Sequence, residues 1–260
     1  MMPREKRAYL IVAVLSPLAV LALWTFVTHQ KAVAAIILPP PEAVLASLID
    51  MLQRGYSGVA LSTHIGASLT RVTIAFVLGS ILGTVIGLIR GRVPILDAVF
   101  LVPSEVIRPI PPLGLIPLFI LWFGIGELSK ILLIFVSVFL IMMVNAHAGA
   151  QSATVDTVRA AHSMGANAVQ TFRFVILPSA LPLIMTGLRV AMGTALTILV
   201  ASELLGGDRG LGFVILDASS FFRTTYVFAG IIIIGAIGLA SDRLIALVER
   251  KVVHWRGRQQ

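Results

Sequence analysis

The sequence predicts an all-α integral membrane protein that crosses the bilayer about six times. Of its 260 residues, 58% are hydrophobic and 12% are charged, and the mean hydropathy is +0.99. An ordinary soluble domain has about 25% charged residues. A helix of about 20 apolar residues crosses a hydrocarbon layer of about 30 Å, and several stretches reach this length. Basic residues gather at both ends of the chain and between these stretches.

The first apolar stretch, residues 9–28, follows three basic residues. A cleaved signal peptide has a shorter apolar core and a small-residue cleavage site, which this stretch lacks, so we expect an uncleaved first transmembrane helix. Prolines at 39–41 can end one element and open the next at a helix N-terminus. They predict a short interfacial helix over residues 42–53.

The second apolar stretch has glycine at every fourth position, namely Gly79, Gly83 and Gly87, with Ala75 on the same stripe. Small residues on one face let helix backbones approach closely in lipid. We expect this face to pack against another helix, and a role in conformational sliding stays open. The predicted spans are residues 9–28, 63–89, 95–122, 129–149, 179–204 and 225–247.

Five prolines interrupt the third stretch, which therefore cannot form one unbroken helix. Broken backbone at membrane depth is tolerated where it faces protein or a water-filled cavity, so we expect this segment to border a path. It contains Glu105 and Arg108, which share one helical face. Ionisable residues within a span are functional candidates by default. Either the two form an ion pair that fixes the broken helix, or Arg108 helps an anion to pass.

An even number of spans places both termini on one side of the membrane. Lys and Arg are enriched on the cytoplasmic side, so the basic ends indicate that both termini are cytoplasmic. The turn with Arg90 and Arg92 and the segment with Arg159 and Arg173 fall on the same side. This accounts for 20 basic against 12 acidic residues, a formal charge of +8, without nucleic-acid binding. We expect a multi-pass protein of the bacterial inner membrane.

Several kinds of chemistry are excluded or unsupported by the sequence. The chain has no cysteine, which excludes disulfides and thiolate metal sites. His64, His147 and His162 lack the spacing of a metal site. No lysine follows a glycine, as the phosphate-binding loop of ATPases requires. We therefore predict neither an enzyme activity nor a metal or cofactor bound by this chain.

Residues 152–178 are too polar, and too often interrupted by helix-breaking residues, to cross the bilayer. They nevertheless show helical periodicity. Val158 and Ala161 share one face, Gly165 interrupts the pattern, and a second helical run follows that we expect Pro178 to stop. A glycine after a short helix commonly reverses the chain through a left-handed conformation. The sequence therefore predicts two short helices joined by a tight turn at the cytoplasmic surface.

This segment resembles the EAA signature of ABC importer permeases, in which Glu-Ala-Ala is followed at fixed distances by Gly, Ile and Leu-Pro. The spacing matches throughout, but Arg159 stands where the family usually has Glu, and Val175 where it has Ile. In the family this loop docks into a cleft of an ATPase subunit, and the Glu commonly contacts a basic residue there. Here either Asp156 supplies the carboxylate, or the ATPase presents an acid to Arg159. The coupling residues that the resemblance implies are Asp156, Arg159, Ala160, Ala161, Gly165, Ala166, Leu177 and Pro178.

Further motifs are similar to the nitrate, sulfonate and taurine branch of these permeases. They lie at residues 108–113, 116–118, 121–127, 129–130, 175–178, 186–189, 201–204 and 209–213, so that the likeness covers residues 38–255. The Arg-Ala-Ala opening and the sequence after Gly165 are most similar to taurine and alkanesulfonate permeases. The path residues that we expect are Glu105, Arg108, Pro109, Pro112 and Arg189. Of these, Arg189 should face a cavity or pair with an acid.

The glycine-rich stretch between the last two spans has two interpretations. It is either a flexible connector or, as the resemblance implies, a contact for a solute-binding protein through Gly207, Asp208, Arg209, Gly210 and Gly212. The resemblance also implies the MetI-like transmembrane fold of type I ABC importers, with a cytoplasmic coupling helix. Residues 1–62 would form the first helix and a periplasmic interfacial segment, 63–247 the permease core with its coupling loop at 152–178, and 248–260 a basic cytoplasmic tail.

The resemblance implies an importer in which two copies of this chain, embedded in the lipid bilayer, combine with two ATPase subunits and a periplasmic solute-binding protein. The ATPase would use ATP and Mg²⁺ and drive alternating access through the loop at 152–178. We expect a small organic anion as solute, taurine or another sulfonate. Nitrate, an aromatic acid or a vitamin precursor are alternatives within the same class. An ion-coupled secondary transporter and a membrane enzyme are the other classes considered, but the sequence shows neither inverted repeats nor a cluster of titratable groups.

Overall fold

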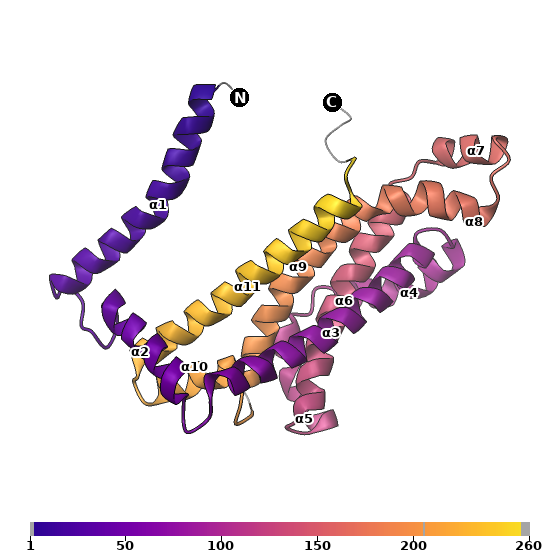
Figure 1. The fold of residues 1–260 in the computed structure, drawn as a ribbon. Coiled ribbons are helices and arrows are strands. Elements are labelled where there is room, and N and C mark those ends of the chain that lie inside the picture. Colours follow the sequence, from indigo (N-terminus) through magenta and orange to yellow (C-terminus); the bar gives the residue numbers. More distant parts are fainter. Residues whose placement is uncertain (1–2, 205, 256–260) are drawn as a thin grey trace. The chain divides into compact units, whose positions relative to one another are not determined.

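The computed structural model describes residues 3–204 and 206–255, and its regular elements are helices (Figure 1). The described elements are α1 (Pro3–His29), α2 (Pro41–Arg54), α3 (Leu61–Arg90), α4 (Pro94–Ile107), the 3₁₀ helix η1 (Pro112–Leu115), α5 (Ile116–Phe123), α6 (Glu127–Gln151), α7 (Val155–Ser163), α8 (Ala168–Thr171), the π-helical segment η2 (Phe172–Ile176), α9 (Leu177–Leu204), α10 (Leu211–Ser220) and α11 (Thr224–Val252). The predicted all-α class is therefore confirmed.

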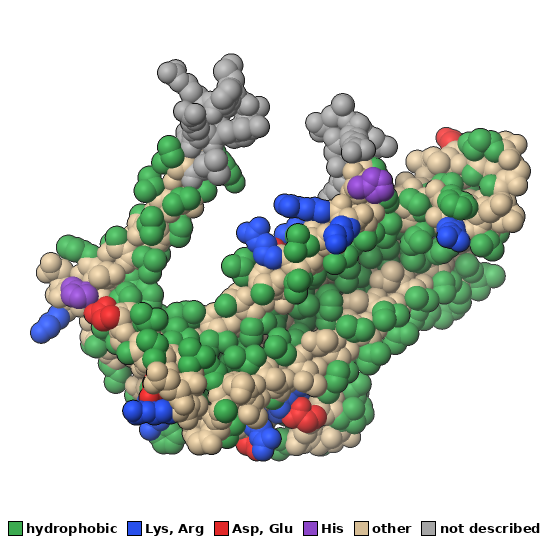
Figure 2. Space-filling view, in the orientation of Figure 1, with side chains coloured by type: hydrophobic (Ala, Val, Ile, Leu, Met, Phe, Trp, Pro, Cys, Tyr) green, Lys and Arg blue, Asp and Glu red, His purple; other side chains and the backbone are tan. Residues whose placement is uncertain are grey.

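Five of the described helical segments are long and apolar enough to cross a membrane, and a bent helix pair adds a sixth if it counts as one span. This agrees with the sequence prediction of about six spans. Figure 2 shows a band of hydrophobic side chains along the long helices, with charged side chains gathered toward helix ends. In the most apolar 18-residue window of α1, no residue is buried within the described structure. This is expected for a helix whose side chains face lipid. The predicted helix at 42–53 corresponds to α2, which begins at a proline.

The predicted break in the third span is present. Helix α4 ends at Ile107, and the segment formed by η1 and α5 continues at an angle of 86° to it. Prolines 109 and 111 lie between the two parts, and Pro112 begins η1. A proline lacks the backbone N–H and its ring clashes with the preceding turn, so this cluster cannot be accommodated in one straight helix.

The expectation that Pro178 ends the second helix of the loop is wrong. The chain is helical from Ala168 to Leu204, through α8, η2 and α9. In η2 the backbone N–H of Leu177 donates to the carbonyl of Phe172, five residues earlier. This wider turn lies directly before Pro178, where a π-bulge can relieve the clash between a proline ring and the carbonyl four residues before it. The helix therefore continues with a local widening.

The glycine stripe of α3 packs against α6, as the sequence predicted. A β-carbon added to Gly83 would lie 2.6 Å from the carbonyl oxygen of Phe139 and 2.8 Å from the β-carbon of Met142. Gly79 and Gly87 face α6 in the same way. Because the obstructing atoms include backbone, they cannot move aside as a flexible side chain could. Helix α6 also packs extensively against α9, and the buried core lies among these helices.

We expect Gly83→Ala to destabilise the protein by about 1–3 kcal/mol, the usual cost of overpacking a tight contact. Gly66 lies in the same helix with open space where its β-carbon would be, so it provides the control. Gly66→Ala should be neutral or slightly stabilising, because alanine favours a helix over glycine. Unfolding midpoints in detergent would measure both. Equal midpoints for the two variants would show that close approach at Gly83 is not required.

The described chain forms two compact units. One contains the residues up to Thr63 together with Val214–Ile232, and the other contains His64–Phe213 and the residues from Ile233 onward. In the first unit, the hydroxyl of Tyr56 donates to Asp217 at 2.7 Å and that of Tyr226 donates to Asp50 at 2.8 Å. Burial and the hydrogen bond to Asp217 raise the pKa of the Tyr56 phenol above its ordinary value, which keeps it protonated as a donor.

Candidate functional site

An open cavity of about 340 Å³ lies beside the break in the third span. Its walls come from the α4–η1 segment, α6 and α9. The lining residues are Ser104, Ile107, Arg108, Ile110, Pro112, Ser137, Leu140, Ile141, Met143, Val144, Asn145, Val190 and Thr194. Ligand pockets are typically apolar with a few polar groups that orient the ligand. The cavity has this composition, and the broken backbone borders it as the sequence predicted.

The five predicted path residues are not all brought together. Arg108 and Pro112 line the cavity, and Pro109 lies between them in the chain, whereas Glu105 and Arg189 are not in its lining. Glu105 and Arg108 are both exposed, and the ion pairs of the described residues include none between them. The predicted ion pair is therefore not formed in this conformation, and Arg108 faces the cavity without a carboxylate partner.

Arg189 pairs with an acid, which is one of the two roles predicted for it. Its Nε lies 2.8 Å from Oδ1 of Asp242, and Nη2 lies 3.1 Å from Oδ2, so the two groups form a bidentate pair between α9 and α11. Glu249 lies 3.8 Å from Nη1. Both Arg189 and Asp242 are exposed at the surface of the unit.

A buried network of ion pairs joins α3, α6 and α9. Arg71 is 4% exposed and its Nη1 lies 2.6 Å from Oε1 of Glu203, which is fully buried. The Nε and Nη2 atoms of Arg71 donate to the two carboxylate oxygens of Glu127 at 2.5 Å. Nη1 also donates to the backbone carbonyl of Arg209 at 3.0 Å. Four of the five guanidinium N–H groups thus have acceptors, so the charge is well compensated.

The same network holds the glycine-rich stretch in place. The backbone N–H of Gly212 donates to Oε2 of Glu203 at 2.8 Å, and that of Leu211 donates to the hydroxyl of Ser68 at 2.9 Å. Gly210 has φ +125°, and a β-carbon there would overlap the Glu203 carboxylate, so only glycine fits. These contacts fix the backbone of Gly210, Leu211 and Gly212 against the buried network. By contrast, the side chains of Asp208 and Arg209 are exposed, 3.7 Å apart, and Gly207 lies just before them.

Arg71 is a site residue that was not predicted, although its sequence context carries a signal. An arginine within an apolar span is costly unless it is paired or faces water, and Arg71 lies within such a stretch. Glu203 lies near the end of another span. What the sequence could not supply was the pairing, because residues 132 positions apart become neighbours only through packing of α3 on α9.

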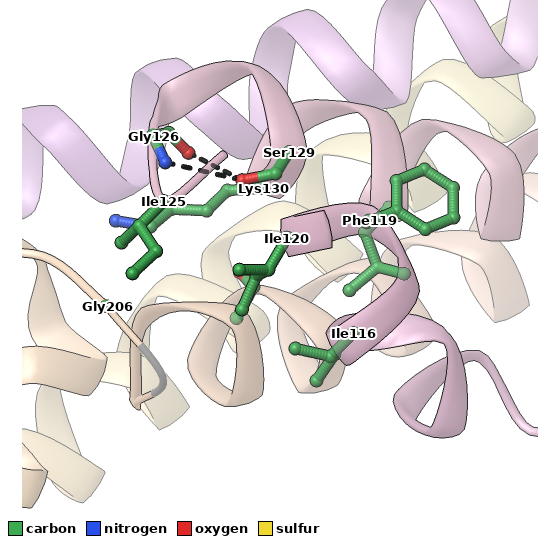
Figure 3. Close-up of a pocket in the computed structure, with 10 residues that line it drawn as sticks. Ile116, Phe119, Ile120, Ile125, Gly126, Ser129, Lys130 and Gly206 are labelled. Atoms are coloured by element: carbon green, nitrogen blue, oxygen red, sulfur yellow. Dashed lines mark hydrogen bonds between the residues drawn. The ribbon is translucent and has the colours of Figure 1, made fainter. Parts of the chain in front are cut away.

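A narrow pocket lies beside this network, between α5, α6 and the glycine-rich stretch (Figure 3). It encloses about 10 Å³, room for about one water molecule. Figure 3 shows the Lys130 side chain extended beside Ile125, while the Ser129 hydroxyl lies against the backbone of Gly126. This pocket is too small for an organic solute, unlike the cavity beside Arg108.

The segment from 152 to 178 contains the turn that its sequence predicted. Gly165 has φ +84°, the backbone N–H of Ala166 donates to the carbonyl of Ala161 at 3.0 Å, and that of Gly165 donates to the carbonyl of His162 at 2.9 Å. This pair of bonds is the Schellman motif that ends helices with a left-handed glycine. Asn167 then opens α8 with a reciprocal capping box. In Figure 1, α7 and α8 project together at one end of their unit.

A groove of about 350 Å³ opens at this bend, lined by Ala161, Met164, Gly165, Ala166, Gln170, Phe174 and Val175. Met164 is 82% exposed and Phe174 69%. Adjacent exposed apolar side chains often mark a protein contact. Ala160 lies on the exposed side of α7, while Leu177 and Pro178 lie in the first turn of α9 and lie outside the groove lining. Asp156 and Arg159 are exposed, with Oδ1 and Nη1 3.9 Å apart.

Comparison with known proteins identifies one family. Residues 75–254 match the family described as "Binding-protein-dependent transport system inner membrane component". The taurine transport system permease protein TauC of Escherichia coli (strain K12) is 38% identical over 241 residues, which is 92% of this chain and 88% of that protein. The putative aliphatic sulfonates transport permease protein SsuC of Bacillus subtilis (strain 168) is 35% identical over 255 residues, 98% of this chain and 91% of that protein.

More distant matches agree with these two. The nitrate import permease protein NrtB of Synechocystis is 33% identical over 225 residues, 83% of this chain and 80% of that protein. Among solved structures, a crystal structure of an amino acid ABC transporter with histidines matches with a TM-score of 0.53 and 23% identity, covering 73% of this chain and 92% of that one. At this identity the likeness shows the fold alone.

Proposed function

This chain belongs to the family of binding-protein-dependent transport system inner membrane components, and from this premise we propose that it is the permease subunit of an ATP-driven importer for taurine or another small sulfonate. Its relatives place it among the ABC importer permeases of the taurine, sulfonate and nitrate branch. The observation that best supports a separate motor is the exposed apolar groove around Gly165, on a segment that projects from the span bundle.

The proposed assembly has two copies of this chain in the membrane, two ATPase subunits docked on residues 152–178, and a periplasmic solute-binding protein. In this arrangement both termini are cytoplasmic, ATP and Mg²⁺ are bound by the ATPase, and this chain contributes no catalysis. The cavity beside Arg108 is the proposed section of the path. The exposed Gly207, Asp208 and Arg209 are the proposed contact for the binding protein. The backbone N–H of Gly210, which donates to Nδ1 of His64, and that of Gly212, which donates to Glu203, would hold this contact in position.

Uptake of labelled taurine into proteoliposomes that contain the copurified complex tests this function. We expect uptake to require ATP, the ATPase and the binding protein together. Competition by nitrate, aromatic sulfonates and carboxylates would rank the alternative solutes. Uptake driven by an ion gradient without ATP would instead support a secondary transporter and overturn the proposal.

The charge contacts of the coupling loop can be assigned with one substitution. We expect Arg159→Glu to lower ATP-dependent uptake about tenfold or more, since an ATPase acid facing Arg159 would then meet a like charge. The exposed pair of Arg159 and Asp156 contributes little to stability, so the fold should persist. Asp156→Ala serves as the control and should have a small effect. Unchanged uptake in Arg159→Glu, with a loss in Asp156→Ala, would assign the contact to Asp156.

A further inference from the structure

The cavity beside the broken span combines one cation with four neutral polar side chains and no acid. The cation is Arg108, and the neutral groups are Ser104, Ser137, Asn145 and Thr194. All other lining residues are apolar, so these five groups decide which ligand chemistry the cavity can satisfy. None of them belongs to the coupling loop or to the buried network of Arg71.

Arg108 has no hydrogen-bond or ion-pair partner for its side chain among residues 3–204 and 206–255. A guanidinium stays charged at any physiological pH, and an unpaired charge within a membrane span is costly. Its planar donors match the oxygens of a carboxylate or an oxyanion. The cavity is therefore suited to an anionic group beside Arg108.

Each of the four neutral side chains already donates a hydrogen bond to a backbone carbonyl of its own helix. The hydroxyl of Ser137 donates to the carbonyl of Leu133 at 2.9 Å, and that of Thr194 donates to the carbonyl of Val190 at 3.1 Å. Ser104 donates in the same way to the carbonyl of Phe100, and the Asn145 amide to that of Ile141. The hydroxyl oxygens keep only lone pairs for a ligand, and Asn145 keeps Oδ1 and one N–H. Apart from Arg108, the cavity thus mainly accepts hydrogen bonds.

We propose that this cavity selects a small zwitterion, with an anionic group held by Arg108 and a primary ammonium received by the oxygens of Asn145, Thr194 and Ser137. The proposal rests on the proposed function and assigns part of the solute selectivity to this chain. An ammonium has three donors and no acceptor, which complements oxygens whose own hydrogens are engaged. At about 340 Å³ the cavity has room for a short aminoalkyl sulfonate, since a water molecule needs only about 10–15 Å³ of the same volume.

An anion without a donor fits this cavity less well. Entry of nitrate or an alkanesulfonate would remove water from the oxygens of Asn145 and Thr194 without replacing the lost hydrogen bonds, and buried polar groups left unpaired are costly. A site that offers hydrogen bonds to a polar ligand group discriminates strongly against an analogue that lacks the group. The proposal therefore predicts a preference that depends on the ammonium.

The test compares taurine with 1-propanesulfonate, in which a methyl group replaces the ammonium at nearly the same size. Binding of tritiated taurine would be measured to the permease–ATPase complex in lipid nanodiscs, without the binding protein, and competed with 1-propanesulfonate and β-alanine. We expect taurine to bind at least tenfold more tightly than 1-propanesulfonate. β-Alanine, which retains the ammonium on a carboxylate, should compete better than 1-propanesulfonate. Equal binding of taurine and 1-propanesulfonate, or the reverse order of the two competitors, would overturn the proposal.

Variants locate the preference. Asn145→Leu combined with Thr194→Val should weaken taurine binding at least tenfold and should strengthen 1-propanesulfonate binding, because the oxygens that this ligand leaves unpaired are removed. Arg108→Gln should weaken the binding of both ligands. Thr186→Val is the control, because Thr186 makes the same bond to the carbonyl four residues earlier in α9 but does not line the cavity. Equal losses for both ligands in the double variant would overturn the proposal. ATP-dependent taurine uptake by the complete complex, without discrimination at the cavity, would refute only this inference. Absence of ATP-driven uptake of either sulfonate would refute the proposed function itself.

Discussion

Replacement of Arg71 by alanine is expected to destabilise the protein by about 3–5 kcal/mol, the usual cost of removing one partner of a buried ion pair. The loss would leave the carboxylate of Glu203 fully buried without its counter-ion. It would also free Glu127 and the carbonyl of Arg209 from their donor. Denaturant or thermal unfolding in detergent measures the change in stability. We also expect a lower yield of folded protein from this variant.

The neighbouring Arg209 provides the matched control for Arg71. Its side chain is exposed, and the ion pair that it forms within the described residues is with the exposed Asp208. Its contribution to the network is a backbone carbonyl, which alanine retains. Arg209→Ala should therefore change stability by less than about 1 kcal/mol. The double variant Arg71→Met with Glu203→Gln should recover part of the stability lost in Arg71→Ala, because residue 203 then carries no buried charge that lacks its counter-ion. If Arg71→Ala unfolded like the parent protein, the network would not stabilise the fold.

Replacement of Gly165 by valine is expected to reduce ATP-dependent uptake about tenfold, with little change in the stability of the span bundle. The left-handed conformation costs an ordinary L residue about 1–2 kcal/mol, and a β-branched residue is especially poor there. An energy of 1.4 kcal/mol is a tenfold change in population. Space is not the obstacle, because no atom of the described residues, apart from Gly165 and its two chain neighbours, lies within 4 Å of the position of an added β-carbon.

Gly165→Asn separates backbone conformation from side-chain size. Asparagine visits the left-handed region readily, and its side chain is similar in volume to that of valine. Uptake should therefore remain close to that of the parent protein in Gly165→Asn, while the amount of ATPase bound to the permease should fall in Gly165→Val. Full uptake in the valine variant would show that the bend around Gly165 does not transmit the motion of a motor.

Local features of the fold followed from local sequence. The proline cluster before α5 predicted the break of the third span, because proline lacks the backbone N–H of a helix and its ring clashes with the preceding turn. Gly165 predicted the turn between α7 and α8, because glycine adopts the left-handed backbone conformation readily. The prediction that the helix ends at Pro178 was wrong, because a π-helical turn before this proline lets the helix continue. Helix α10 was not predicted, because its ten residues are too few to be recognised as a membrane span.

Some residues of the candidate site were likewise predicted from the sequence and others were not. Arg108 and Pro112 were identified from the cost of a charge and of a broken helix in a membrane, and both line the cavity. Glu105 was identified by the same argument, yet it has neither the expected ion pair nor a place in the lining. Arg71 was overlooked, although it is the centre of the most extensive network of charges described here.

The sequence alone determined that the chain is helical, that it has about six segments apolar enough to span a membrane and that residues 152–178 contain a polar bend between two of them. These features follow from hydropathy and backbone restrictions, which act within a few neighbouring residues. Only the tertiary structure decided which charges meet. Arg71 of α3 contacts Glu203 of α9, and Arg189 of α9 contacts Asp242 of α11. The composition of a helix determines neither which helix lies beside it nor how it is rotated about its own axis. The cavity beside Arg108 has the same origin, since its walls come from segments that are far apart in the chain.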